Sequence, residues 1–228
     1  MRPVPPSEIR PVTPRLFIAN KAYSSWSLRP WLLLTEFGIP FDETVIPMYR
    51  PETRAEMLAV SPNGKMPALH DGAVVVPESL AIVEYLAEGY PDLAIWPRDR
   101  AARALARAIS SEMHAGFMKL RQTCPTNFRR TPKAIAIDEG VRADVVRIEA
   151  IWADARARFG NHGPFLFGAF SAADAMYAPV VNRFHAYAIP MSPASRAYMD
   201  AVMALPSWRA WIAGAEAEPW HHTGYDDI

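Results

Sequence analysis

The sequence predicts an α/β part with a small mixed sheet, followed by an all-α part. In about the first ninety residues, short strand-like segments alternate with helix-like segments, an order that gives a sheet with helices on its faces. After Gly89 no convincing strand pattern remains, and apolar residues recur every three or four positions, which is typical of amphipathic helices.

The α/β part begins with a short apolar strand. The helix that follows it ends at Phe37 because Gly38 and Pro40 stop a helix, and Pro30 is tolerated because it falls in the first turn. Asp71-Gly72 predicts a tight hairpin between two strands. The predicted elements are strand 15–18, helix 28–37 with Ser24 and Ser25 at its amino end, strand 41–47, helix 51–59, strands 68–70 and 74–76, and helix 78–88.

The second part reads as a helical bundle. Apolar spacing predicts one helix through Leu105–Leu120 and another through Ile137–Phe159, with Thr131-Pro132 as a start signal. Ser171 and Asp174 form a capping-box pattern that opens a further helix. The predicted organisation is a proline-rich extension at 1–14, an α/β domain at 15–89, a linker at 90–98 and an all-helical domain at 99–228.

Composition excludes several classes of protein. Lysine plus arginine and aspartate plus glutamate both total 24 in 228 residues, so the basic excess of nucleic-acid-binding domains is absent. No apolar run approaches the roughly 18 residues of a membrane helix, and Met1–Pro14 lacks the apolar core of a signal peptide. The single cysteine, Cys124, fits a reducing compartment. We therefore expect a cytoplasmic protein with no nucleic-acid and no membrane partner.

Four motifs in this order carry a family resemblance: Ser24-Ser25-Trp26-Ser27-Leu28-Arg29, Asn63-Gly64-Lys65-Met66-Pro67-Ala68-Leu69, Pro77-Glu78-Ser79-Leu80-Ala81-Ile82 and Phe170-Ser171-Ala172-Ala173-Asp174. Over roughly residues 15–215 the chain resembles cytosolic glutathione transferases, and its first motif resembles the Ser-Ser-Cys-x-x-Arg opening of zeta-like, serine-type members. The resemblance implies a thioredoxin-like first domain with four strands and three helices, glutathione as co-substrate, and a homodimer. Serine in place of a catalytic cysteine disfavours disulfide reduction, and Trp26 departs from the cysteine of the zeta motif.

The chemistry expected of the first motif is stabilisation of a thiolate. The thiol of glutathione is mostly protonated at neutral pH, whereas the thiolate is the nucleophile. A hydroxyl donor and the positive end of a helix both favour the thiolate, and we expect both to act at Ser24 and Ser25. By alignment Ser24 contacts the sulfur, and Ser25 is its neighbour or replacement. The alternatives are that the serines only cap the helix, or that Tyr23 is the donor.

By resemblance, the next two motifs bind glutathione. Met66 pairs its backbone with the cysteinyl residue, beside a cis bond to Pro67. Glu78 binds the ammonium group, while Ser79 and helix N-terminal amides bind the γ-glutamyl carboxylate. Lys65 can reach the glycyl carboxylate. The alternatives without a ligand are an ordinary trans proline, a capping pair and a solvated lysine.

A second substrate is expected between the two domains. Aromatic and methionine stripes at helical spacing are more often core than binding site, so the wall residues are chosen from scattered positions. The candidate walls are Trp26, His114, Phe117, Met118 and Tyr177, with Arg183 as a clamp for an anion.

The leading hypothesis is a transferase that conjugates the thiolate of glutathione to a small electrophile. One alternative uses glutathione as a returning cofactor in cis–trans isomerisation of a diacid, as a maleylacetoacetate isomerase does, and Arg183 would favour it. Another is a transferase-like binding module without turnover. No motif for a nucleotide or a metal is present, so we expect no metal.

Overall fold

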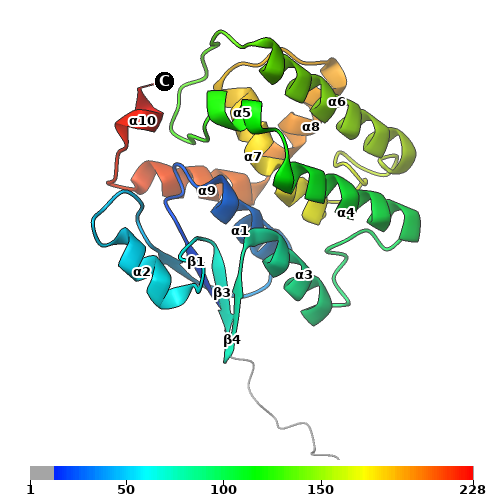
Figure 1. Cartoon of the computed structure of the whole chain (residues 1–228). Coiled ribbons are helices and arrows are strands. Elements are labelled where there is room, and N and C mark those ends of the chain that lie inside the picture. Colours follow the sequence, from blue (N-terminus) through cyan, green and yellow to red (C-terminus); the bar gives the residue numbers. More distant parts are fainter. Residues whose placement is uncertain (1–12, 228) are drawn as a thin grey trace, which may run out of the picture.

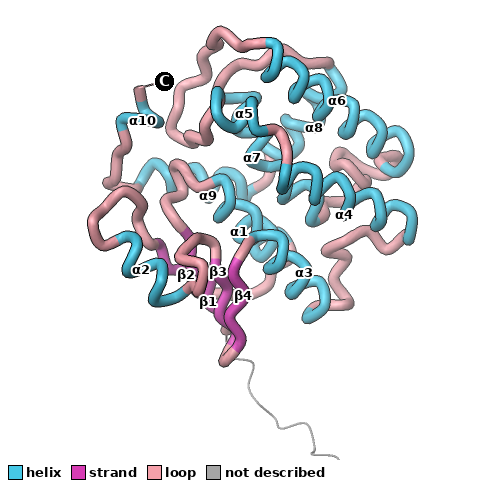
Figure 2. Tube along the Cα trace, viewed as in Figure 1, coloured by secondary structure: helices cyan, strands magenta, loops and turns pink. Residues whose placement is uncertain are grey.

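The computed structural model describes residues 13–227, so the predicted extension at 1–14 lies outside the described residues apart from Thr13 and Pro14. A small sheet with helices on both faces is joined to a part in which every named element is a helix (Figure 1; Figure 2). The predicted fold class, α/β followed by all-α, is confirmed.

The sheet is four-stranded, with the order β2-β1-β3-β4. Strand β1 (Arg15–Ile18) is parallel to β2 (Asp42–Val45) and antiparallel to β3 (Ala68–Asp71). Strand β4 (Val74–Pro77) pairs with β3 through the predicted hairpin and forms one edge of the sheet.

The side chains of β1 alternate between two hydrophobic cores, as expected for a strand buried on both faces. Leu16 and Ile18 belong to the large core that continues into the helical part, whereas Phe17 packs with Met57 on the opposite face. Helices α1 (Ser25–Glu36) and α3 (Ser79–Gly89) cover the first face, and α2 (Thr53–Val60) covers the second (Figure 1).

Helix α1 ends as the sequence predicts. Gly38 has a φ of 63°, a left-handed conformation that glycine adopts without steric cost. Its N–H donates to Thr35 O over 3.2 Å, and Ile39 N donates to Leu34 O over 2.9 Å. These two bonds satisfy carbonyls of the last turn.

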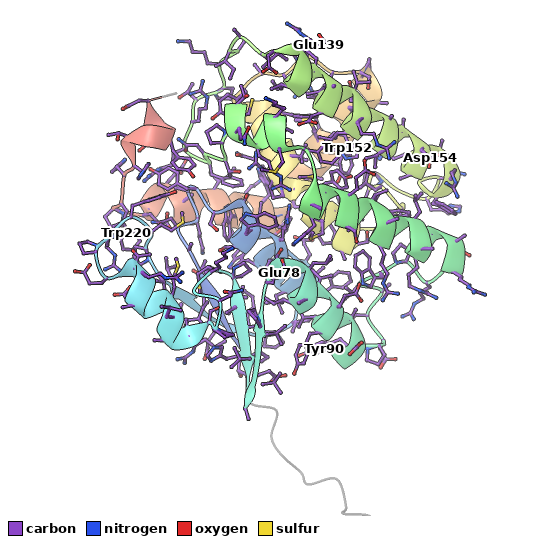
Figure 3. All side chains as sticks on the ribbon, viewed as in Figure 1. Glu78, Tyr90, Glu139, Trp152, Asp154 and Trp220 are labelled. Carbon is purple, nitrogen blue, oxygen red and sulfur yellow. The ribbon has the colours of Figure 1, made fainter. Side chains whose placement is uncertain are left out.

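Helix α7 runs through the middle of the helical part, and of its residues only His185 is not buried (Figure 1). Trp152 of α6 lies inside this part and contacts the rings of Tyr177 and Phe184 of α7 (Figure 3). The helices are α4 (Arg100–Ala115), α5 (Met118–Thr123), α6 (Glu139–Phe159), α7 (Ala172–Ala186), α8 (Pro193–Met203), α9 (Pro206–Ala217) and α10 (Thr223–Asp226). No helix of residues 13–227 is long and apolar enough to cross a membrane.

The prediction of one helix through Leu105–Leu120 was wrong. The chain breaks at Gly116 and Phe117, where Phe117 has a φ of 60°. The Arg121 side chain donates to the carbonyls of Met113 and Gly116 (2.9 Å to Gly116 O), so these carbonyls bind a guanidinium and need no further helical turn.

The start signal at Thr131-Pro132 was also misplaced. Helix α6 begins at Glu139, and the Asp138 side chain accepts the Val141 N–H over 2.8 Å as its cap. The segment 131–138 before it forms no regular secondary structure, and Lys133 N donates to Ala186 O at the end of α7 over 3.1 Å.

The capping box at the start of α7 is confirmed. The Asp174 carboxylate accepts from Ser171 N over 2.9 Å and from Leu166 N over 3.1 Å, although the residue is completely buried. Burial is the main cause that raises the pKa of Asp174 to about 6.

This raised pKa predicts a pH-dependent contribution to stability. Because the folded chain holds the Asp174 proton more tightly than the unfolded chain, the contribution is complete below about pH 4 and is lost as the pH rises through about 6. We expect the free energy of unfolding of the native chain, relative to Asp174→Asn, to fall by up to about 3 kcal/mol between pH 4 and pH 7. Urea unfolding of both proteins across this range measures the difference, in which all other carboxyls cancel. A difference that is constant with pH would contradict the prediction.

Candidate active site

Two adjoining cavities lie between the α/β part and the helices, and Trp26 and His114 line both of them. The first, of about 260 Å³, is lined by Trp26, Asn63, Lys65, Met66, Pro67, Glu78, Ser79 and His114. The second, of about 320 Å³, is lined by Tyr23, Ser24, Ser25, Trp26, Met48, Tyr49, His114, Met118, Arg121, Pro125, Thr126, Arg183 and Tyr225. The fold thus brings all five residues expected to bind glutathione to one cavity, and both serines to its neighbour.

The Met66-Pro67 peptide bond in the first cavity is cis. Neither the N–H nor the C=O of Met66 makes a hydrogen bond to another described residue. Pro67 O accepts the Glu78 N–H over 3.2 Å, and this bond holds the loop against the start of α3. The backbone of Met66 therefore keeps a strand-like donor and acceptor for a further partner.

Glu78 joins the end of β4 to the start of α3 (Figure 3). It has a φ of 84°, and its carboxylate accepts from Leu80 N over 3.1 Å and from Ala81 N over 3.2 Å in the first turn of α3. The Ser79 hydroxyl also donates to it, over 2.8 Å. The donors expected to bind the ligand's carboxylate are thus engaged by Glu78 itself, and a ligand would have to share or displace these bonds.

The two serines differ in what their hydroxyls do. Ser24 is the N-cap of α1, and its Oγ accepts the Ser27 N–H over 3.3 Å and lies 2.9 Å from Ser27 Oγ. Ser27 Oγ in turn accepts the Ala19 N–H over 3.0 Å. Ser25 makes no side-chain hydrogen bond to a described residue. The capping alternative therefore describes Ser24 correctly, and its hydroxyl proton is donated to Ser27 Oγ in this structure. Because both hydroxyls can donate or accept, the direction of this bond can reverse and release the Ser24 proton.

The structure places four of the six candidate wall residues at the second cavity. Trp26, His114, Met118 and Arg183 line it, and His114 Nδ1 lies 3.5 Å from Glu78 Oε1. Tyr177 does not, because it is fully buried and its hydroxyl donates to Ile109 O over 3.2 Å. Phe117 does not line either cavity, because its left-handed backbone turns it into the core.

Comparisons with known proteins identify the family. The model of the glutathione S-transferase N-terminal domain matches residues 23–88, and the model of the C-terminal domain matches residues 133–214. The chain belongs to the glutathione S-transferase family.

The individual relatives of this chain have low sequence identity to it or match only about half of it. A probable maleylacetoacetate isomerase of Caenorhabditis elegans is 32% identical over 107 residues, which is 47% of this chain and only 49% of the relative. A glutathione S-transferase-like protein, OpS6, of Beauveria bassiana is 24% identical over 90% of this chain and 91% of the relative. A zeta-class transferase of Euphorbia esula is 29% identical over 52% and 53% of the two chains. The chain thus spans about half the length of the first and third relatives.

Solved glutathione transferase structures share the fold. A homologue from Burkholderia, solved with bound glutathione, has a TM-score of 0.71 at 23% identity and covers 91% of this chain and 100% of its own. A transferase from the Antarctic clam Laternula elliptica has a TM-score of 0.65 at 24% identity, with 88% and 92% covered.

In this family member residues 218–227, which we call the C-terminal strap, reach the second cavity. Tyr225 of the strap lines the cavity, and the Tyr23 hydroxyl donates to Asp226 over 2.8 Å. Arg129 and the His222 N–H both donate to the same hydroxyl. Burial and the Asp226 bond raise the pKa of Tyr23. The hydroxyl of Tyr23 is thus engaged by the strap and by Arg129 in this structure.

Tyr23→Phe tests this assignment. Because a hydrogen bond to a charged group contributes about 1.5–3 kcal/mol, we expect amide exchange in the strap to accelerate about tenfold or more. Conjugation of glutathione should stay within about threefold. Mass-spectrometric hydrogen exchange measures the first, and Tyr85→Phe, which removes a similar bond to Asp71, is the matched control. A hundredfold loss of conjugation with unchanged exchange would instead make Tyr23 the sulfur donor.

Several residues of the cavities escaped the sequence analysis. Arg121, Tyr49 and Tyr225 line the second cavity. Ser27 is hydrogen-bonded to the Ser24 hydroxyl. Only Ser27 carried a sequence signal, its place in the first motif. The others come from distant segments, and no local pattern links them to α1.

Proposed function

We propose that the chain is a serine-type glutathione S-transferase that binds glutathione in the first cavity and conjugates it to an electrophile in the second. The observation that carries the proposal is the adjacency of the two cavities at the N-terminus of α1. Residues from three motifs that are separated along the sequence meet there. The N-terminus of α1 adds a positive electrostatic potential.

Each polar group of glutathione has a suitable partner in the first cavity. The N–H and C=O of Met66 can pair with the cysteinyl residue like an added strand. Glu78 offers a carboxylate to the ammonium group, and Ser79 with the amides of α3 suits the γ-glutamyl carboxylate. Lys65 lines the same cavity and supplies a cation for the glycyl carboxylate.

Ser24 is the proposed donor to the sulfur. In the structure the Ser24 hydroxyl donates to Ser27 Oγ over 2.9 Å and accepts the Ser27 N–H. In the proposed complex the bond between the two hydroxyls is reversed, so that Ser27 donates to Ser24 Oγ and the proton of Ser24 is directed at the thiolate. A hydrogen bond to the ionised sulfur and the α1 N-terminus both favour the thiolate. The thiolate then attacks an electrophilic carbon, forms a carbon–sulfur bond and expels the leaving group.

A second function, cis–trans isomerisation of a diacid, is favoured by one observation. Arg121 and Arg183 both line the second cavity, which gives it a cationic wall suited to a carboxylate. Here glutathione would add to the substrate and leave again unchanged. The assignment of the chain to the zeta-like, serine-type members, which rests on the first motif, is also part of what we propose.

Binding and activity assays test both functions. Isothermal titration should show heat with millimolar glutathione, and the absence of heat would contradict both. Conjugation of a chloronitrobenzene supports the transferase, and isomerisation of a maleyl diacid supports the second function. Binding without either activity would leave the chain as a binding module.

Homodimerisation and a cytoplasmic location stay predictions. The edge strand β4 exposes Val74 and Val75, with 46% and 42% of their surfaces accessible, which is an apolar edge that a second copy could cover.

A further inference from the structure

Arg29 is a buried charged residue that lies against Trp26 of the candidate site. It lies on α1 one turn after Ser25, so the two residues share a face of the helix. The residue is completely buried, and none of its guanidinium nitrogens has a hydrogen-bond partner among the described residues. Buried charges are normally paired, because their desolvation is costly.

Arginines, not carboxylates, dominate the surroundings of Arg29. Its guanidinium lies 4.2 Å from the centre of the Trp26 ring, and that of Arg121 lies 4.9 Å from the same ring. The groups that act on Arg29 are Arg121 from α5, Arg183 and Tyr177 from α7, and Glu78 at the start of α3. Desolvation, followed by repulsion from Arg121 and Arg183, lowers the pKa of Arg29 well below its usual value.

The only carboxylate among these groups is already engaged. Glu78 accepts hydrogen bonds from the amides of α3 and from Ser79, so its charge is shared with that helix. Arg29, Arg121 and Arg183, which we call the arginine cluster, therefore leave a positive potential around Trp26. Trp26 lines both cavities, so an anion placed where they meet would feel this potential through the poorly polarisable interior.

We infer that Arg29 is a further residue of the glutathione site, whose buried charge favours the thiolate over the thiol without touching the sulfur. This inference rests on the proposed function. A structural role alone does not account for the charge, because an apolar side chain of similar volume fills such a position without the cost of desolvation. The Asp144 carboxylate acts on Arg121, whereas the carboxylate that acts on Arg29 is Glu78, which is engaged by α3. The ionised sulfur therefore supplies Arg29 with a negative charge.

The test compares Arg29→Met with Arg29→Lys in the full chain. The thiolate absorbance of bound glutathione, followed against pH, measures the pKa of the bound thiol. A unit charge roughly 10 Å away at an effective dielectric constant of about 20 shifts a pKa by about one unit. We therefore expect Arg29→Met to lower the thiolate fraction about tenfold at a pH below the thiol pKa. Arg29→Lys should recover most of it wherever the lysine is charged.

Arg107→Met is the matched control, because Arg107 is half-exposed and pairs with Glu84 on the outer surface. It should leave the thiolate titration unchanged. Arg121→Met removes a less buried member of the arginine cluster and should give a smaller shift in the same direction, which tests the inference even if Arg29→Met does not fold.

The outcomes separate this inference from the proposed function. If the native chain binds no glutathione, or binds it without ionising its thiol, the proposed function fails first. If the native chain ionises the thiol, and folded Arg29→Met or Arg121→Met does so with the same pKa, the inference about Arg29 is overturned and the proposed function stands.

Discussion

Ser24→Ala is expected to lower the rate of glutathione conjugation about a hundredfold. Removing one donor from a preorganised site of developing or fixed negative charge typically costs a factor of about 10²–10³. The Ser24 hydroxyl is preorganised in this way, because Ser27 N and Ser27 Oγ lie 3.3 and 2.9 Å from it and fix its orientation. Turnover with a chloronitrobenzene, measured at saturating glutathione, checks the prediction.

The controls for Ser24→Ala separate chemistry from helix capping. Loss of the N-cap should also lower the free energy of unfolding by about 1 kcal/mol, so activity is compared well below the melting temperature. Ser27→Ala keeps the capping acceptor on Ser24 and removes only the supporting hydroxyl, so a loss of about tenfold is expected. Ser25→Ala should change turnover by less than threefold. A large loss in Ser25→Ala with full activity in Ser24→Ala would transfer the role to Ser25.

Glu78→Ala is expected to weaken glutathione binding about 10- to 100-fold. The carboxylate is the proposed partner of the ligand's ammonium group, and a hydrogen bond to a charged group contributes about 1.5–3 kcal/mol. The substitution also frees the α3 amides that the carboxylate now engages, and part of the loss is offset if the ligand's own carboxylate binds them. Isothermal titration measures the affinity.

Two variants isolate the role of this charge. Glu78→Gln keeps an acceptor for the α3 amides and removes only the charge, so most of the loss in affinity should remain. Glu84→Ala removes a carboxylate from the same helix that pairs with Arg107 away from the cavities, and binding should be unchanged. Equal affinities of Glu78→Ala and Glu84→Ala would rule out an ammonium-binding role for Glu78.

Local signals predicted the elements well where they are strong and self-contained. The glycine after α1, the Asp71-Gly72 hairpin and the Ser171–Asp174 capping box each act within a few residues. The break at Gly116 was not predictable in this way, because it depends on Arg121 binding the end of α4. Likewise, the segment before α6 is hydrogen-bonded through Lys133 N to the end of α7, a contact distant in sequence, and the helix begins only after the cap at Asp138.

The residues of the candidate site also differ in whether local sequence or distant contacts determine their position. Residues of the three N-terminal motifs were located from the sequence because each motif is contiguous and its backbone geometry is local. Tyr177 was misassigned because helical spacing cannot say which face of α7 meets the cavity and which meets Trp152. The C-terminal strap was missed because its bonds to Tyr23 and Asn127 join segments about a hundred residues or more apart.

By itself the sequence determined the order of strands and helices in the α/β part, the family, and the contiguous motifs that surround the first cavity, since these depend on spacing and local backbone preference. Only the tertiary structure decided which polar groups are left without partners. Hydrogen-bond satisfaction is a property of the packed chain as a whole. It engages Tyr23 with the strap and leaves the guanidinium of Arg29 without a hydrogen-bond partner among residues 13–227.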